Sequence, residues 1–102
     1  MTVQTVLVHG IRTSATMWRS QVEYLEALGH PVTAVDLPGH GSRMDEDFTL
    51  HEALHTIDAA VRAAAEKGPV LLVGHSMGGL LSLAYTGGAE PPPVDGLVAA
   101  AC

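Results

Sequence analysis

Residues 70–79 constrain the fold of this chain more than any other segment. The apolar run Val70-Leu71-Leu72-Val73 leads directly into Gly74-His75-Ser76-Met77-Gly78-Gly79. We expect a strand over the apolar run, a helix after Ser76, and between them a turn so tight that side chains at positions 74 and 78 would collide. Glycine at both positions permits this turn, which holds Ser76 at strained backbone angles and lifts its hydroxyl above the edge of the sheet.

Short apolar runs bounded by turn residues recur elsewhere in the sequence. These further runs cover residues 3–8, 32–35 and 96–101. Each is dense and non-alternating, which is typical of strands buried on both faces of a parallel sheet.

Helical patterns separate these runs. The first has apolar residues at positions 18, 22, 25 and 28 and stops at Gly29-His30-Pro31, a typical end of a helix. The second has them at positions 50, 54, 57, 61 and 64, and opens with Thr49 and Glu52 as a capping box. A third helix is predicted from Ser76 to about Tyr85. This alternation predicts an α/β fold, a parallel sheet with flanking helices joined by right-handed crossovers.

The chemistry predicted at the turn is nucleophilic attack by Ser76. Because Ser76 opens a helix, the amide of Met77 points toward a reacting carbonyl, and the helix dipole favours the negative charge that develops on its oxygen. One amide is an incomplete oxyanion hole. We expect the second from the turn after the first strand, at His9-Gly10-Ile11.

Four segments in order now carry a family resemblance: Leu7-Val8-His9-Gly10, Trp18, the stretch 29–41 that ends in Asp36-Leu37-Pro38-Gly39-His40-Gly41, and the Ser76 turn. They resemble the N-terminal half of the α/β-hydrolase superfamily and are similar to its esterase, monoacylglycerol-lipase and cofactor-free haloperoxidase branches. The resemblance implies that Ser76 attacks a carboxylic ester or related acyl bond to form an acyl-enzyme. It further implies that the amides of Ile11 and Met77 form the oxyanion hole, with a small-molecule acyl substrate and with neither a cofactor nor a metal.

The partners of the serine are missing from the sequence. In this fold the nucleophile is followed along the chain by an acid and then a histidine, yet none of the six histidines follows Ser76. His9 is expected to hold the oxyanion turn and His75 to point away from the hydroxyl. Only Glu90 and Asp95 are acidic residues after Ser76, and both precede the last predicted strand.

We therefore expect residues 1–102 to be the N-terminal part of a single α/β-hydrolase domain, truncated after the strand that follows the nucleophile helix. The catalytic Asp and His would lie beyond this chain. Pairing with a missing C-terminal half would then complete the site, and the chain alone would be inactive. Its last strand would be an exposed apolar edge. The alternative is a noncatalytic or partner-dependent fragment that keeps the turn without the reaction.

Charge and composition limit the expected binding partners and cellular location. Eleven acidic and five basic side chains give a net charge of -6, which argues against nucleic acid and anionic membranes as partners. The single cysteine, Cys102, excludes an intrachain disulfide, and no stretch is long enough for a membrane span. We expect a cytoplasmic protein.

Two other motifs compete with this interpretation. His51-Glu52-Ala53-Leu54-His55 matches the zinc-protease pattern HExxH, but its histidines fall on the predicted solvent face and no third ligand is evident. A dinucleotide fold with Asp36 as the ribose-binding acid lacks the glycine-rich GxGxxG turn after the first strand. Trp18 is most simply a core anchor, and Arg12 is either a substrate contact or a surface residue.

Overall fold

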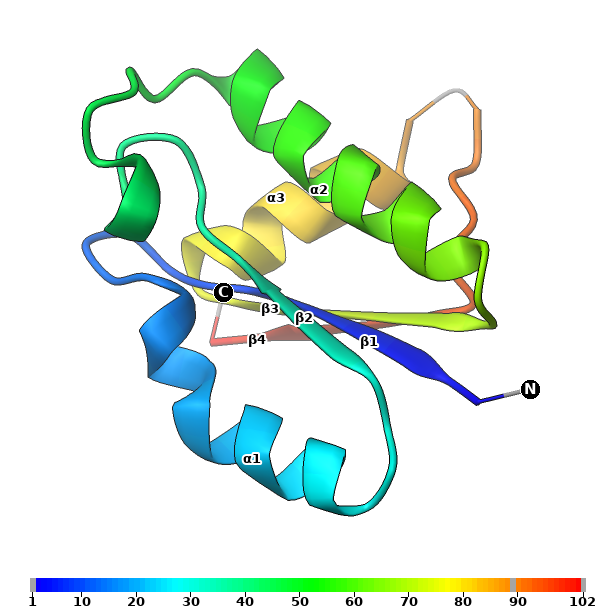
Figure 1. The fold of residues 1–102 in the computed structure, drawn as a ribbon. Helices are drawn as coiled ribbons and strands as arrows, with labels where there is room; N and C mark the ends of the chain where they lie inside the picture. The colour runs from blue at the N-terminus through cyan, green and yellow to red at the C-terminus, as the bar shows by residue number, and fades with distance from the viewer. Residues whose placement is uncertain (1, 89, 102) are drawn as a thin grey trace.

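The four apolar runs form a four-stranded parallel sheet in the computed structural model, which describes residues 2–88 and 90–101 (Figure 1). The strands are β1 (Gln4–Val8), β2 (Val32–Val35), β3 (Val70–His75) and β4 (Gly96–Ala100). The helices are α1 (Arg19–Ala27), α2 (Leu50–Ala65) and α3 (Met77–Thr86), with short 3-10 segments η1 (Ala15–Trp18) and η2 (Gly41–Arg43). The predicted α/β class, a parallel sheet with flanking helices, is confirmed.

The strand order explains where a site can form. The strands lie in the order β2-β1-β3-β4, so the chain leaves β1 in one direction to form β2 and then crosses to the other side of β1 to form β3. The register places Val8 beside Gly74 at the carboxyl ends of β1 and β3. In open parallel sheets a ligand crevice forms outside these ends, at the point where the strand order reverses.

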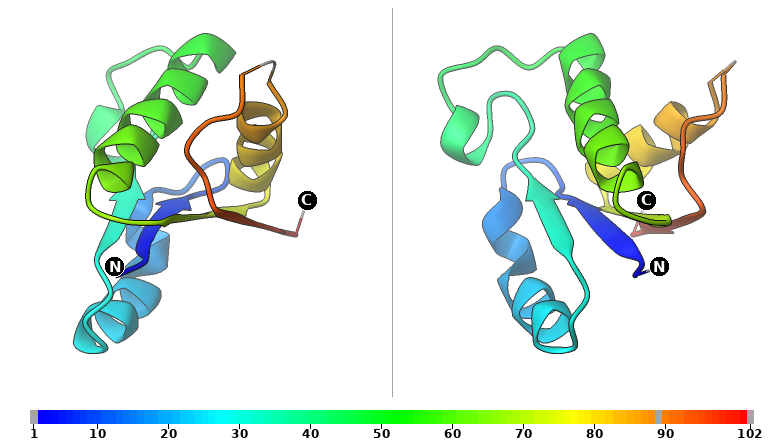
Figure 2. Two further views of the ribbon diagram at one scale, coloured as in Figure 1. Left: turned by 90° about the vertical axis from the view of Figure 1, so that its right-hand side faces the viewer. Right: turned by 45° about the vertical axis from the view of Figure 1, so that its right-hand side comes forward.

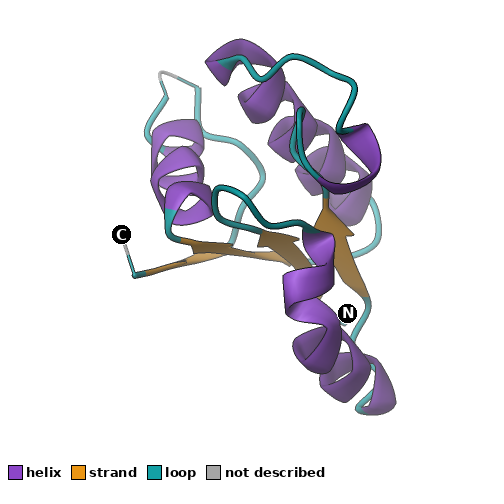
Figure 3. Ribbon diagram, turned by 90° about the vertical axis from the view of Figure 1, so that its left-hand side faces the viewer, coloured by secondary structure: helices purple, strands orange, loops and turns teal. Residues whose placement is uncertain are grey.

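The helices form layers on both faces of the sheet. Helices α2 and α3 pack side by side on one face, and α1 lies on the other (Figures 1 and 2). Figure 3 shows the same layering from the opposite side. The main core lies between the sheet and α2 with α3, and its buried residues are Val6, Val8, Val35, Leu37, Ala53, Ile57, Val61, Ala64, Val70, Leu72 and Leu81.

The apolar stripe predicted for α2 is corrected at its first turn. Ile57, Val61 and Ala64 are buried as expected, but Leu50 is 58% exposed and Ala53 is fully buried in its place. Leu50 is the first residue of the helix, whereas Ala53 is on the same face as Ile57 and Val61, four and eight residues later. The predicted cap is present in its first half, since Thr49 Oγ1 accepts a hydrogen bond of 3.1 Å from the Glu52 N–H.

Burial on both faces holds for β1 but is wrong for the other three strands, since even in β2 only Val35 is buried. All of β1 is buried, whereas β3 alternates between buried and half-buried residues, and the second half of β4 is exposed. The reason is that α1 packs beside β2, leaving the β3 and β4 half of that face more open. Helix α1 itself contributes no fully buried residue.

The last strand agrees with the expectation of an apolar edge. Val98 is 48% exposed, and β4 is an edge strand of the described sheet, paired with β3. Asp95 enters this strand as predicted, and its Oδ2 accepts a hydrogen bond of 2.8 Å from the Val70 N–H at the start of β3. Across the described residues, no helix has the length and apolar character needed to cross a membrane.

Candidate active site

The turn at Ser76 has the strained geometry expected from its glycines. Ser76 lies between β3 and α3 with φ of 56° and ψ of -120°, in the left-handed half of backbone space that residues with a Cβ rarely adopt. A Cβ on Gly74 would collide with the backbone of Gly78, and a Cβ on Gly78 would collide with the carbonyl oxygens of Val8 and His9. Gly74 therefore permits the tight turn itself, and Gly78 permits its close approach to the end of β1.

The loop after β1 faces this serine. A Cβ on Gly10 would lie 3.2 Å from Ser76 Cβ, so the two backbones meet across the carboxyl ends of β1 and β3. A cavity of about 300 Å³ opens beside them. It is lined by Gly10, Ile11, Thr13, Met17, His75 and Ser76. Ser76 is thus placed at an open crevice, where its hydroxyl makes no hydrogen bond with any other described residue.

Of the two predicted oxyanion donors, Ile11 lines this cavity, and Met77 directly follows Ser76. Ile11 follows Gly10 and its side chain is 62% exposed, and Met77 is the first residue of α3. Within the described part of the chain, neither backbone N–H has an intramolecular acceptor. Both amides are therefore free to bind a ligand atom.

His9 is fully buried and fixes the shape of the loop. Its Nε2 lies 3.0 Å from the Leu37 backbone nitrogen, which donates a hydrogen, so Nε2 is unprotonated. Its Nδ1 then carries the proton and donates to the Gly10 carbonyl at 2.7 Å. Burial lowers the pKa of His9, and the nearby His40 lowers it further, which favours this neutral form. The expectation that His9 holds the loop is confirmed.

This contact also orients the Ile11 amide. The Gly10 carbonyl and the Ile11 N–H belong to one planar trans peptide and point in opposite directions. Because His9 holds the carbonyl, the N–H is held pointing the other way. With both ring nitrogens engaged, His9 is not available as a general base for Ser76.

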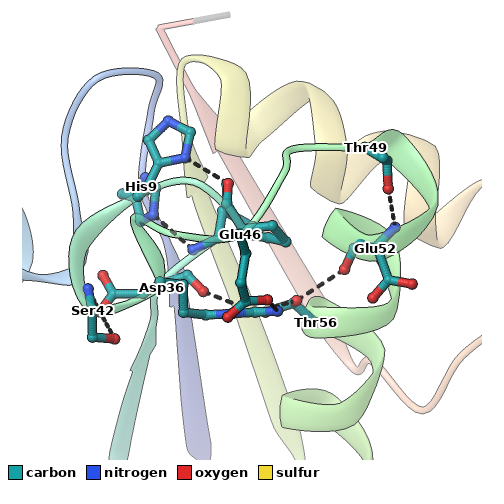
Figure 4. Close-up of polar contacts among 11 residues, drawn as sticks. His9, Asp36, Ser42, Glu46, Thr49, Glu52 and Thr56 are labelled. Atoms are coloured by element: carbon teal, nitrogen blue, oxygen red, sulfur yellow. Dashed lines mark hydrogen bonds and ion pairs between the residues drawn. The ribbon is translucent and has the colours of Figure 1, made fainter.

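Asp36 holds the other end of the same loop, a role that sequence patterns alone missed. Its Oδ1 accepts a hydrogen bond of 2.8 Å from the Ala15 N–H, and its Oδ2 accepts from the Ser42 N–H and hydroxyl at 3.2 and 2.8 Å (Figure 4). Burial raises the pKa of Asp36, but the hydrogen bonds from Ala15 and Ser42 outweigh it and leave the pKa lowered. A Cβ on Gly41 would overlap this carboxylate, so the glycine at 41 was the available signal.

The loop after β2 is fastened to α2 by Arg43. Its guanidinium donates to the Asp36 carbonyl at 3.2 Å and to Thr56 Oγ1 at 2.6 Å, and it forms two hydrogen bonds with the Glu46 carboxylate. Figure 4 shows these contacts converging next to Glu46 and Thr56. The loops that follow β1 and β2 are therefore both anchored, one to the other and to the helix layer.

Trp18 is a core anchor, as expected. Its side chain is 8% exposed, and its ring meets the ring of His75 edge-on with centroids 6.5 Å apart. Its indole N–H has no acceptor among the described residues. His75 is therefore packed beside Trp18 at the wall of the Ser76 cavity.

The zinc interpretation of residues 51–55 gains no support. His51 and His55 are exposed on α2, as the helical pattern predicted. Over residues 2–88 and 90–101, no three His, Cys, Asp or Glu side chains are grouped as a metal site would require. A dinucleotide site also lacks its glycine-rich phosphate-binding turn, because Gly10 is the single glycine in residues 10–14.

Comparison with known protein families identifies the family to which this sequence is related. A sequence model described as the alpha/beta hydrolase family matches residues 5–102, nearly the whole chain. This chain belongs to the α/β-hydrolase family. The match extends from β1 through the Ser76 turn to β4, so it covers every feature of the crevice described above.

Relatives of this α/β hydrolase include named esterases. The chain is 43% identical over 79 residues to esterase PIR7B of Oryza sativa subsp. japonica, covering 74% of this chain and 30% of that protein. A solved thioesterase domain from the curacin biosynthetic pathway superposes with a TM-score of 0.80 at 30% identity, covering 96% of this chain and 36% of that structure. The crystal structure of polyneuridine aldehyde esterase gives a TM-score of 0.72 at 32% identity, with coverage of 84% and 35%.

The chain spans about 30% of the length of the curated relatives it matches. Family membership and esterase-type relatives support a hydrolase at the level of the superfamily. The particular reaction is taken up below as a proposal.

Proposed function

We propose that this chain supplies the nucleophile and oxyanion hole of a serine hydrolase that cleaves carboxylic esters or related acyl bonds. The observation that carries the proposal is Ser76 itself: a residue with φ of 56°, held between β3 and α3, next to Gly10 at a cavity of about 300 Å³. The esterase and thioesterase names among its relatives support an acyl substrate.

In the proposed reaction, Ser76 Oγ attacks the carbonyl carbon and its proton passes to a general base. The carbonyl electron pair moves onto oxygen, where the N–H groups of Ile11 and Met77 donate to it. Collapse of this intermediate re-forms the carbonyl and breaks the bond to the leaving alcohol, which departs with a proton. Water then hydrolyses the acyl-enzyme to a carboxylic acid and restores Ser76.

The general base and its acid partner are proposed to lie on further polypeptide. None of the six histidines follows Ser76, and the buried His9 has both ring nitrogens engaged. The relatives, about three times as long as the matched region, leave room for these groups. A small acyl compound in the cytoplasm, without a metal or cofactor, is the proposed setting.

Covalent labelling with a fluorophosphonate tests the proposal. A reading frame that continues beyond Cys102 should give a protein labelled at Ser76, and Ser76→Ala should abolish the label. Ser20→Ala is the matched control, because Ser20 is exposed on α1 and should leave labelling unchanged. The 102-residue chain alone should not be labelled, since a serine without a base stays protonated.

Two results would contradict the proposal. Labelling that persists in Ser76→Ala would remove Ser76 as the nucleophile. Absence of labelling and of esterase activity in the extended protein would favour the alternative, a noncatalytic or partner-dependent fragment.

A further inference from the structure

A second cavity, larger than the one at Ser76, is lined by the segments that follow β1 and β2. Its volume is about 610 Å³. Its walls come from two loops that Asp36 ties together, and they consist of Arg12, the hydroxyl-bearing residues Thr13, Ser14 and Thr16, residues 39–41, and Met44. Thr13 also lines the cavity at Ser76, so the two cavities have this residue as a common wall.

Arg12 gives this cavity its charge. It carries the only formal charge among the lining residues at neutral pH, and its guanidinium has no hydrogen bond or ion pair with any described residue. Arg43 and Arg62, by contrast, are paired with Glu46 and Asp58. In a chain with a net charge of -6, an unpaired arginine in a cavity without acidic walls is a favourable place for an anion.

Among the described residues, no ion pair joins Arg12 to Asp36. Asp36 lies between the same two loops, but its two oxygens already accept three hydrogen bonds from Ala15 and Ser42. His40, the other titratable residue in the walls, directs Nδ1 to the Pro38 carbonyl at 3.0 Å. The guanidinium of Arg12 and the hydroxyl of Thr13 have no hydrogen-bond partner among the described residues. Ser14 Oγ and Thr16 Oγ1 share one hydrogen bond, so one of these two hydroxyls also keeps a hydrogen that no described residue accepts.

The backbone of Arg12 is also unusual. Its φ is 62°, a conformation that glycine adopts without steric cost and a residue with a Cβ rarely does. Arg12 follows Ile11, whose amide is the proposed oxyanion donor. The strained position thus places a long cationic side chain one residue along the chain from the proposed oxyanion donor, and strain of this kind is concentrated at ligand-binding sites.

We propose that Arg12 binds a carboxylate carried by the substrate, so that the preferred acyl compounds bear a second, ionised acid group a short chain away from the scissile carbonyl. Arginine recognises a carboxylate through two parallel N–H donors, which fixes orientation as well as charge. The inference rests on the proposed function, because it takes the carbonyl to lie at Ser76.

Binding to the 102-residue chain tests this subsite without requiring catalysis. Titration with monomethyl succinate, followed by amide chemical shifts, should perturb residues 12–16 and 39–41. The neutral near-isostere methyl 4-oxopentanoate should bind at least tenfold more weakly. Arg12→Gln should remove this difference, whereas Arg19→Gln, which changes an exposed arginine outside both cavities, should preserve it.

Other outcomes overturn the inference. Equal affinity for the charged and neutral esters, or a preference that survives in Arg12→Gln, would show that Arg12 does not select the ligand. Equal affinity for acetate and monomethyl succinate would mark a general anion site and not a substrate site. Fluorophosphonate labelling of Ser76 is a separate readout, so failure of the proposed hydrolase reaction is distinguishable from failure of the carboxylate subsite.

Discussion

The Nε2 atom of His9 accepts a hydrogen bond of 3.0 Å from the backbone N–H of Leu37. The donor can only be the amide, so the ring must be neutral at Nε2, and its other nitrogen is left to hold the Gly10 carbonyl. One buried side chain thus connects the end of β2 to the loop that faces Ser76. Protonation of Nε2 would break this connection.

This connection predicts a loss of stability in mild acid. Because burial lowers the pKa of His9 below 6.5, the unfolded state binds a proton more readily than the folded state. Stability should therefore be full above about pH 6.5 and fall as the pH decreases below it, by at most about 1.4 kcal/mol per pH unit for this one group. Urea unfolding at about pH 7.5 and about pH 5.5 measures the difference.

His9→Gln should make the pH dependence shallower, because an amide oxygen can accept from the Leu37 N–H without titrating. His51→Gln is the matched control on the exposed face of α2 and should retain the dependence of the unchanged protein. Identical slopes for the unchanged protein and His9→Gln would contradict the assignment to His9.

Strain at Ser76 predicts that glycine stabilises this position. Ser76→Gly should raise the free energy of unfolding by about 1 kcal/mol. A positive φ costs about 1–3 kcal/mol for a residue with a Cβ, and the greater conformational entropy of glycine in the unfolded chain offsets part of the strain that is relieved. Ser76→Ala keeps the Cβ and should stay within about 0.5 kcal/mol of the unchanged protein. Urea denaturation of the three proteins measures this, and a glycine variant less stable than the alanine variant would show that the turn is not strained.

The three hydrogen bonds to Asp36 predict that its charge orders the loop after β1. Asp36→Asn replaces one acceptor oxygen by an amide group that faces donors, so we expect a loss of about 1–2 kcal/mol in the free energy of unfolding. Hydrogen exchange at the Ala15 amide should become faster, since its acceptor is Asp36 Oδ1. Asp45→Asn, at an exposed position in the next loop, is the control. Unchanged exchange at Ala15 in Asp36→Asn would contradict this role.

The sequence by itself determined the class of fold and the strained turn. Apolar runs, helix caps and paired glycines act over a few residues, so their geometry follows from local sterics and hydrogen bonding. For that reason Ser76, the Thr49 cap and the end of the third helix near Tyr85 were predictable. Local pattern was less reliable for burial, because exposure at Leu50 and along β4 depends on what packs above them.

Tertiary structure decided which residues support the crevice. The contacts of His9 with Leu37 and of Asp36 with Ala15 join positions 28 and 21 residues apart, and they exist only because β1 and β2 are neighbours in the sheet. The sheet order likewise brings Gly10 against Ser76 and sets Arg12 beside residues 39–41. Such contacts leave no local periodicity, since they depend on strand pairing between segments that no short-range pattern links.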